Sequence, residues 1–290
     1  MVRTLLALLL AATAGAPPSD ASLKLDRFNR EIGATGLMQD AERATAIRES
    51  FRRTLSTLDV TALGGVELRA FFVAALNASS LARDRGLAPV ARRAFDELDA
   101  RHALVEQDYG NMQGLYLRLR EFDEASQFVE AFGPRASLEA VPSIGTSPGF
   151  DAARPSRFTV IDRKHLLLEN APTSGDFVLV IADPSCHFTR DAVISITDDP
   201  QLHAYFERHS QWLAPDGLSL RLDAVLDWNH ALPEYPLSLV NDVHAWGGVD
   251  YWDTPTFYFF RAGRIVRTIR GWPPEGHLAE LKEAIRRTGR

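Results

Sequence analysis

The residues most suited to chemistry lie in one short stretch, DPSCHFTRDAV, at positions 183–193. It holds Cys186, the only cysteine in the 290 residues. His187 follows directly, and Thr189 lies three positions after the cysteine. A cysteine in the first turn of a helix has its pKa lowered by the helix dipole and the free N–H groups, and a protonated His187 would add to this effect. The pattern predicts a nucleophilic thiolate that reacts with thiols or disulfides.

Asp183 opens the same stretch and is a candidate for proton transfer near the sulfur, although it could equally be a turn residue before Pro184. Cys186 itself has two other interpretations, a small packing residue in an inactive site or a metal ligand. The eight histidines show no tight ligand spacing, and His187 is adjacent to the cysteine rather than spaced to converge with it. We therefore expect neither a metal ion nor any other cofactor.

The elements that must position these residues alternate between strand-like and helical patterns. The run FVLVIAD, residues 177–183, predicts a buried strand that ends at the cysteine motif. TFYFF and RIVRTIR predict a hairpin across Ala262-Gly263. Further strands are expected in RFTVID, HLLLE and LSLRLDAVLD, and helices at about 190–213, 233–246 and 275–288. The alternation predicts an α/β domain over residues 158–290, with a mixed central sheet flanked by helices.

A different pattern comes before this domain. Apolar residues at spacings of three and four, such as Phe51, Leu55 and Leu58, predict an all-α N-terminal domain over residues 22–138. Proline, serine and glycine then accumulate over residues 139–157, which predicts a linker.

One segment of the helical domain, GLYLRLREFDEASQFVEAFGPRA, resembles a tetratricopeptide repeat. A weak echo lies 34 residues upstream, since Ala91 precedes Ala125 and Leu98 precedes Phe132 by that spacing. The resemblance implies a domain of stacked helical hairpins, and an unrelated helical bundle is the alternative.

The order of elements after residue 158 resembles the thioredoxin fold. A buried strand ends in a Cys-x-x-x motif that opens a helix, a second strand and helix follow, and Thr254-Pro255 leads into a hairpin and a C-terminal helix. The resemblance implies a cis bond before Pro255 and a Thr254 backbone opposite the sulfur, where a partner lays an extended peptide. Trp246 comes shortly before this point, either as an apolar contact for the peptide or as a core residue.

The chain departs from the redox members of this superfamily at one position. They carry Cys-x-x-Cys, whereas the motif here is Cys186-His187-Phe188-Thr189. Thr189 cannot form a disulfide, so the resemblance implies the fold and the attacking position but not the complete dithiol cycle. The motif is most similar to a thioredoxin-like branch in which Asp-Pro follows the motif helix, and here Asp199 and Pro200 can cap and open the next helix.

The N-terminus predicts export. MVR followed by LLALLLAA and small residues is a signal-peptide pattern, with cleavage after Ala14, Ala16 or Ala21. We expect a signal peptide over residues 1–21 and a mature protein in the periplasm or outside the cell, and a buried N-terminal helix is the alternative. No later segment approaches about 18 uninterrupted apolar residues, so no membrane span is expected. Only three of the 32 basic residues are lysine, which indicates a GC-rich bacterial source, and the net charge of −6 offers no basic field for nucleic acid.

Two functions from different classes fit these residues. The first is an exported monothiol thioredoxin-like oxidoreductase that acts on thiols or disulfides of partner proteins through a mixed disulfide at Cys186, which an external thiol releases. The second is a redox-inactive binding or scaffold protein that holds a protein partner through its helical domain and the groove beside Pro255. A peroxidase is less favoured, because Cys186 lacks the upstream threonine that peroxiredoxins use.

Overall fold

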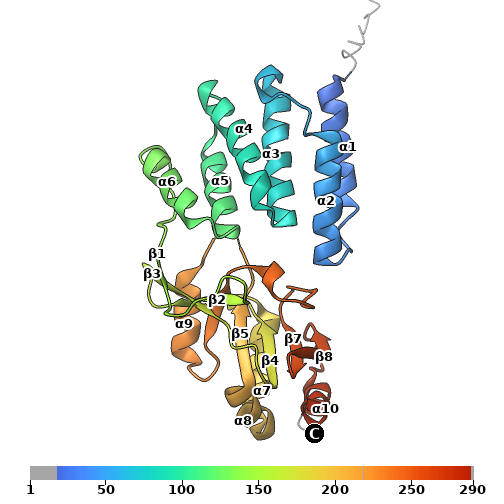
Figure 1. Ribbon diagram of the computed structural model, residues 1–290, viewed down its shortest axis with the longest axis vertical. Helices are drawn as coiled ribbons and strands as arrows, with labels where there is room; N and C mark the ends of the chain where they lie inside the picture. Colours follow the sequence, from blue (N-terminus) through green and yellow to red (C-terminus); the bar gives the residue numbers. More distant parts are fainter. Residues whose placement is uncertain (1–17, 218, 289–290) are drawn as a thin grey trace, which may run out of the picture.

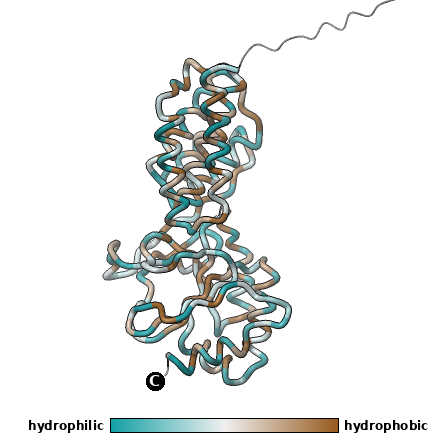
Figure 2. Tube along the Cα trace, turned by 90° about the vertical axis from the view of Figure 1, so that its right-hand side faces the viewer, coloured by the Kyte–Doolittle hydropathy of each residue, from teal (hydrophilic) through white to brown (hydrophobic). Residues whose placement is uncertain are grey.

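The structure, a computed structural model, describes residues 18–217 and 219–288. Over these residues a helical part occupies one end of the long axis and a part built on one sheet occupies the other (Figure 1, Figure 2). The expected signal peptide lies outside the described residues as far as residue 17, and the first helix begins at Asp20.

The N-terminal part is helical, as the sequence predicts, and each of its helices packs against the next in the chain. Phe28 lies edge-on to Phe51 at 5.9 Å between the first two helices, and Phe95 contacts Phe72 and Phe128 in the same core. The helices are α1 (Asp20–Gly33), α2 (Asp40–Thr54), α3 (Gly65–Ala82), α4 (Ala88–Ala100), α5 (Glu106–Arg118) and α6 (Phe122–Phe132), with the 3-10 turns η1 (Val60–Ala62) and η2 (Arg85–Leu87) between them.

The residues of the 34-residue echo are all buried, Ala91 and Leu98 on α4 and Ala125 and Phe132 on α6. A repeat predicts this burial, and so does a bundle of six helices. The tetratricopeptide-like organisation stays a prediction.

The C-terminal part holds a mixed sheet of eight strands in the order β1-β3-β2-β6-β5-β4-β7-β8 among the described residues. The strands β4, β5 and β6 run parallel, and β7 pairs antiparallel with β4 on one side while β2 pairs antiparallel with β6 on the other. The strands are β1 (Ser143–Thr146), β2 (Ser156–Val160), β3 (His165–Asn170), β4 (Phe177–Ile181), β5 (Ser210–Ala214), β6 (Leu237–Val240), β7 (Thr256–Arg261) and β8 (Arg264–Arg270).

Both faces of this sheet are covered, which is why β4 is an uninterrupted apolar run. Val178 and Val180 of β4 belong to the core on the face covered by α7 (His187–Asp198), α8 (Pro200–His209), α9 (Leu222–Ala231) and α10 (Leu278–Thr288). Leu179 and Ile181 point to the other face, which the loop from Val243 to Trp252 covers after the short turn η3 (Val243–Ala245).

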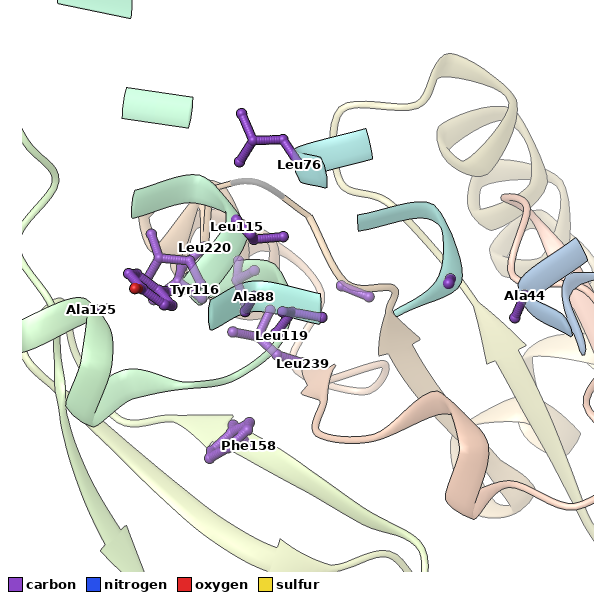
Figure 3. Close-up of a cluster of buried hydrophobic side chains, with 14 of the residues drawn as sticks. Ala44, Leu76, Ala88, Leu115, Tyr116, Leu119, Ala125, Phe158, Leu220 and Leu239 are labelled. Atoms are coloured by element: carbon purple, nitrogen blue, oxygen red, sulfur yellow. The ribbon is translucent and has the colours of Figure 1, made fainter. Parts of the chain in front are cut away.

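The hydrophobic core continues from the sheet into the helical part. Figure 3 shows Leu115 and Leu119 of the helical part in one cluster with Leu220 and Leu239 of the sheet part. The Phe122 ring at the start of α6 lies edge-on to Phe158 of β2 at 5.2 Å. The two parts therefore share buried apolar surface.

Three sequence expectations in the middle of the sheet part are wrong. The helix expected at about 190–213 ends at His209 and is followed by strand β5, and the strand expected in LSLRLDAVLD is helix α9. Its buried residues Leu222, Val225 and Trp228 follow a spacing of three, and the apparent alternation came from Leu220 and Leu222 at its start. The segment expected to be a helix at about 233–246 holds strand β6, whose four residues are all buried, and the short turn η3 (Val243–Ala245).

The segment expected to be a linker, residues 139–157, contributes structure to the sheet. It supplies β1, which pairs parallel with β3 at the sheet edge, and the first residues of β2.

The order predicted from the thioredoxin resemblance is otherwise present. Buried strand β4 leads through the cysteine motif into α7, β5 and α9 follow, and β7, β8 and α10 complete the chain. The Thr254–Pro255 peptide bond is cis, as predicted. Ala262 and Gly263 both have positive φ, at 49° and 75°, which is the geometry of the tight hairpin expected there. Asp199 and Pro200 cap and open α8 as predicted.

Candidate functional site

Cys186 lies at the carboxyl end of β4 and is the N-cap residue of α7. The turn that leads to it is held by Asp183, whose carbonyl accepts the Cys186 N–H at 3.0 Å and whose carboxylate accepts the Ser185 N–H at 2.7 Å. The Cys186 carbonyl accepts the Arg190 N–H at 3.1 Å and so begins the helix. The thiol is thus fixed over the free N–H groups of the first turn of α7.

The thiol is half-buried and not in a disulfide. Burial raises the pKa of Cys186, but hydrogen bonds from the Thr189 N–H, the Thr254 and Thr189 side chains and the Phe188 N–H lower it, and the net pKa lies below its ordinary value. A thiolate is therefore more abundant near neutral pH than for an ordinary cysteine.

Thr189 is fully buried one turn behind Cys186, on the inner side of α7. Its hydroxyl accepts the Asp183 N–H at 3.5 Å and stabilises the thiolate. A hydroxyl can support a negative sulfur in this way, but it has no sulfur with which to resolve a mixed disulfide.

Thr254 lies directly across from the thiol, because β7 begins at Thr256 opposite Ile181, the last residue of β4. The Cys186 Sγ donates to the Thr254 carbonyl oxygen at 3.7 Å. Pro255 is buried and its carbonyl accepts the Gly271 N–H at 2.8 Å, which ties the start of β7 to the end of β8. The sequence-predicted pair Cys186 and Thr254 is therefore brought together.

His187 is exposed at the start of α7. Its exposed ring packs on the Phe188 ring, with centroids 3.8 Å apart, and the groups that lower the Cys186 pKa are N–H groups and hydroxyls of other residues. Phe188 is itself exposed, so these two rings form a small aromatic surface beside the thiol.

The Asp183 carboxylate forms an ion pair with Arg221, with Oδ2 and Nη1 3.1 Å apart. Together with its bond to the Ser185 N–H, this makes Asp183 a residue that shapes the turn before Cys186. The sequence analysis missed Arg221, because it lies 38 residues downstream at the start of α9 and only the fold brings it here.

Trp246 does not line an exposed groove. Its side chain is 4% exposed within the core on the far face of the sheet, together with Trp252 and Tyr258. The expectation that it contacts a partner peptide is therefore corrected, since a ring that fills the core cannot be reached.

The helical part adjoins the same edge of the sheet as Cys186. Because β4, β5 and β6 are parallel, their carboxyl ends meet at one edge, where ligands of open α/β sheets bind. Arg120, which follows α5, donates to the carbonyl of Val240 at the end of β6 at 3.0 Å, and Gln39 donates to the Tyr251 hydroxyl at 3.3 Å, three residues before Thr254.

Among the described residues, no group of three or more histidine, cysteine, aspartate or glutamate side chains is placed to hold a metal ion. None of the described helices is long and apolar enough to cross a membrane.

No family model matches the chain, and no curated protein matches it. A thioredoxin-like protein from Bacteroides caccae of known crystal structure is 12% identical, with 98% of this chain and 99% of that chain covered and a TM-score of 0.30. The order of the elements, the helix that begins after Cys186 and the cis bond before Pro255 are those of a thioredoxin-like fold.

Proposed function

We propose that this protein is an exported thioredoxin-like protein in which Cys186 acts as a monothiol on the thiols or disulfides of partner proteins. The observation that carries this proposal is the position of the half-buried thiol at the N-terminus of α7, where its pKa is lowered, opposite the Thr254 carbonyl. A helix terminus and a facing main-chain segment are the two features that an attacking thiol needs, a stabilised thiolate and a place to hold the partner chain.

The chemistry is a thiol–disulfide exchange. The Cys186 thiolate attacks one sulfur of a partner disulfide, a new mixed disulfide forms, and the other partner sulfur leaves as a thiolate that takes up a proton. Since Thr189 cannot attack the mixed disulfide, a second thiol from outside the chain must do so, which releases Cys186 as a thiolate and leaves the partner joined to the external thiol. We propose that the partner lies as an extended segment along the Thr254 main chain.

The rate of Cys186 alkylation against pH tests this proposal. We expect an apparent pKa below the ordinary value of about 8.5, and mixed disulfides with partner proteins that disappear on reduction. The Cys186→Ser variant, which keeps the size of the side chain, is the control and should form none. A thiol that alkylates with an ordinary pKa and traps no partner would rule the monothiol function out.

A second candidate is a redox-inactive binding protein, and a surface of the helical part favours it. Val66 and Val73 of α3 are 87% and 45% exposed and line a groove of about 510 Å³ with Ala70 and Arg69. Exposed apolar residues in a groove are typical of a site that binds another protein.

The two candidates differ in which variant loses its partner. If Cys186 captures partners, Cys186→Ser loses them and the double variant Val66→Ser with Val73→Ser keeps them. If the helical part holds the partner, the outcome is reversed. Affinity purification of each variant from the native compartment, with and without reductant, separates the candidates.

Export is part of the proposal, and the first helix bears on where the signal peptide would end. The Ser19 side chain accepts the Ser22 N–H at 3.0 Å and donates to Glu67 of α3, so it both caps α1 and joins it to α3. Cleavage after Ala14 or Ala16 keeps this contact, whereas cleavage after Ala21 removes it. We expect the mass of the protein purified from the periplasm or medium to correspond to cleavage before Ser19, and a full-length protein confined to the cytoplasm would contradict export.

A further inference from the structure

A cavity of about 310 Å³ lies between the helical part and the sheet, and none of the residues around the Cys186 thiol lines it. The loop after β6 forms one wall, with Asn241 and His244. The helical part forms the other wall with four arginines, Arg48, Arg83, Arg85 and Arg118.

Two of these arginines are already paired. Arg83 Nε donates to both carboxylate oxygens of Asp216, at 2.9 and 3.0 Å, and Arg118 Nε lies 3.2 Å from the same carboxylate. Asp216 is one of three aspartates that line the cavity, and its side chain is 4% exposed. The two guanidinium groups thus share one buried carboxylate, and Arg83 has a second carboxylate partner, because its Nη1 lies 3.5 Å from Asp40.

The other two lining aspartates hold the turns of their own segments. Asp84 accepts the Gly86 N–H at 2.8 Å, and Asp242 accepts the His244 N–H at 2.8 Å. Neither lies within ion-pair distance of an arginine in the part of the chain that the structure describes.

Arg48 and Arg85 line the cavity with exposed side chains, and among the described residues no carboxylate lies within ion-pair distance of either. The charge of Arg85 acts on Glu121, whose pKa it lowers. Arg85 Nε donates to the Leu119 carbonyl at 3.0 Å, and one terminal nitrogen of Arg48 lies 3.5 Å from the Thr45 hydroxyl. Their other N–H groups have no described hydrogen-bond partner, which leaves two guanidinium forks to bind a further acceptor.

Positive charge accumulates behind the same wall. Arg120 is buried and donates to two carbonyl groups, those of Val240 and Leu117, so no described carboxylate pairs with it. Burial lowers the pKa of Arg120 to about 10, and the nearby charge of Arg118 acts in the same direction while Asp216 opposes it. Burial and the charge of Arg83 likewise lower the pKa of Arg118, although Asp216 raises it. Burial also lowers the pKa of Arg83, but Asp216 and Asp40 raise it above its ordinary value.

We propose that this cavity binds a small organic oxyanion, a carboxylate or a phosphate monoester, held by Arg48 and Arg85 against the loop after β6.

The chemistry of the lining supports this class of ligand. The planar guanidinium fork matches the two oxygens of a carboxylate or phosphate and gives strong charge-assisted hydrogen bonds. The volume lies at the lower end of the range of about 300–1,000 Å³ for small-molecule sites, so an organic body fits beside the anionic group. The exposed His244 would add a donor when protonated, and a ligand that contacts both walls would join the helical part to the sheet.

The test is calorimetric titration of the full chain at low salt with phenyl phosphate, benzoate and inorganic phosphate. We expect saturable binding of at least one of the two organic anions, weaker binding of inorganic phosphate, and a loss of affinity as salt rises. The variants Arg48→Gln and Arg85→Gln should each weaken binding by about tenfold or more. Arg30→Gln removes an exposed arginine of α1 outside the cavity and should bind as the unchanged protein does.

The comparison between the organic probes identifies the anionic group, because tighter phenyl phosphate binding indicates a phosphate ligand and tighter benzoate binding a carboxylate. Absence of saturable binding by all three probes would overturn the proposal. So would binding whose affinity is the same in Arg48→Gln, Arg85→Gln and Arg30→Gln.

A second measurement needs no variant. Phenylglyoxal modifies accessible arginines, and the modified positions can be mapped by mass spectrometry. A bound probe should slow modification of Arg48 and Arg85 and leave that of Arg30 unchanged, and equal protection of all three arginines would contradict the proposed site.

Discussion

At the scale of single residues, the reactivity of Cys186 depends on a few hydrogen bonds that oppose its burial. The donors come from two places in the chain, the first turn of α7 and Thr254 before β7. The sequence motif supplies the first group, and the antiparallel pairing of β4 with β7 supplies the second. The thiolate is stabilised by neutral groups, so its pKa should respond to changes in hydroxyls rather than to the exposed His187.

The Thr189→Val variant tests this dependence. It removes the hydroxyl that stabilises the thiolate and keeps the shape of the side chain, although the Asp183 N–H then loses its acceptor. We expect the Cys186 pKa to rise and alkylation at neutral pH to slow several-fold. The rate of iodoacetamide alkylation against pH measures the effect, and His187→Gln is the control that should leave the curve nearly unchanged. Equal shifts in both variants would contradict this account.

Thr189→Cys tests whether the site keeps the geometry of a dithiol motif. Position 189 is buried directly behind Cys186 on the same turn of α7, where a resolving thiol is expected in this fold. Mild oxidation should close a disulfide between positions 186 and 189 and lower the intact mass by two hydrogens, and mixed disulfides with partners should become short-lived. Intact mass and non-reducing electrophoresis show both effects. Persistent mixed disulfides with no loss of mass would mean that the two side chains do not meet.

At the scale of elements, Asp199 joins two helices. Its carboxylate accepts the N–H groups of Gln201 and Leu202, both at 3.1 Å, and forms an ion pair with Lys282 of α10. The bond to Lys282 is the largest reason that the pKa of Asp199 lies below its ordinary value.

Two substitutions separate these roles. Asp199→Asn keeps a capping oxygen and removes the charge, and we expect a loss of at most about 1 kcal/mol in the free energy of unfolding. Asp199→Ala removes both contacts and should cost about 0.5–2 kcal/mol for the cap in addition. Urea unfolding measures both values, and equal losses in the two variants would show that the cap contributes nothing.

The elements also show how much of the fold the sequence could predict. Strand β4, the motif helix and the β7–β8 hairpin follow from local patterns, because each has an unbroken apolar run, a cap or a tight turn. Segment 210–240 is not predictable in this way. Its strands β5 and β6 are short and buried between neighbours, so their apolar residues fit the spacing of a helix as well as that of a strand.

The candidate site divides in the same way. Cys186, Thr189, Thr254 and Pro255 are predictable from motif and order. Arg221 and the arginines around Asp216 are not, because only the folded chain brings them together from distant segments.

At the scale of the whole molecule, Asp216 forms a charged link between the helical part and the sheet. It follows β5, and Arg83 and Arg118 reach it from α3 and α5. Burial raises the pKa of Asp216, but the two arginines lower it by more than burial raises it, so the net pKa lies below its ordinary value. These three residues line the cavity between the two parts, and the two parts also share the hydrophobic core of which Figure 3 shows a portion.

Asp216→Asn should therefore be strongly destabilising. The change leaves the half-buried Arg83 and Arg118 without their shared countercharge, although Arg83 keeps Asp40 at 3.5 Å. Breaking a buried pair from one side typically costs about 3–5 kcal/mol, and we expect a loss of about 3 kcal/mol, at the lower end of this range. Asp223→Asn is a matched control, because both side chains of its ion pair with Arg163 are exposed. Such pairs contribute at most about 1 kcal/mol to the free energy of unfolding. Urea unfolding at neutral pH measures both variants.

The same carboxylate gives a pH dependence with a defined sign. Because the pKa of Asp216 is lower in the folded state, its stabilising contribution is complete above the unfolded value of about 3.9 and is lost as pH falls through the lower folded value. The free energy of unfolding of the unchanged protein should thus fall toward that of Asp216→Asn below about pH 4, and the two curves should run parallel above it. If the difference between them stayed constant into the acid range, the charge of Asp216 would not be what holds the helical part to the sheet.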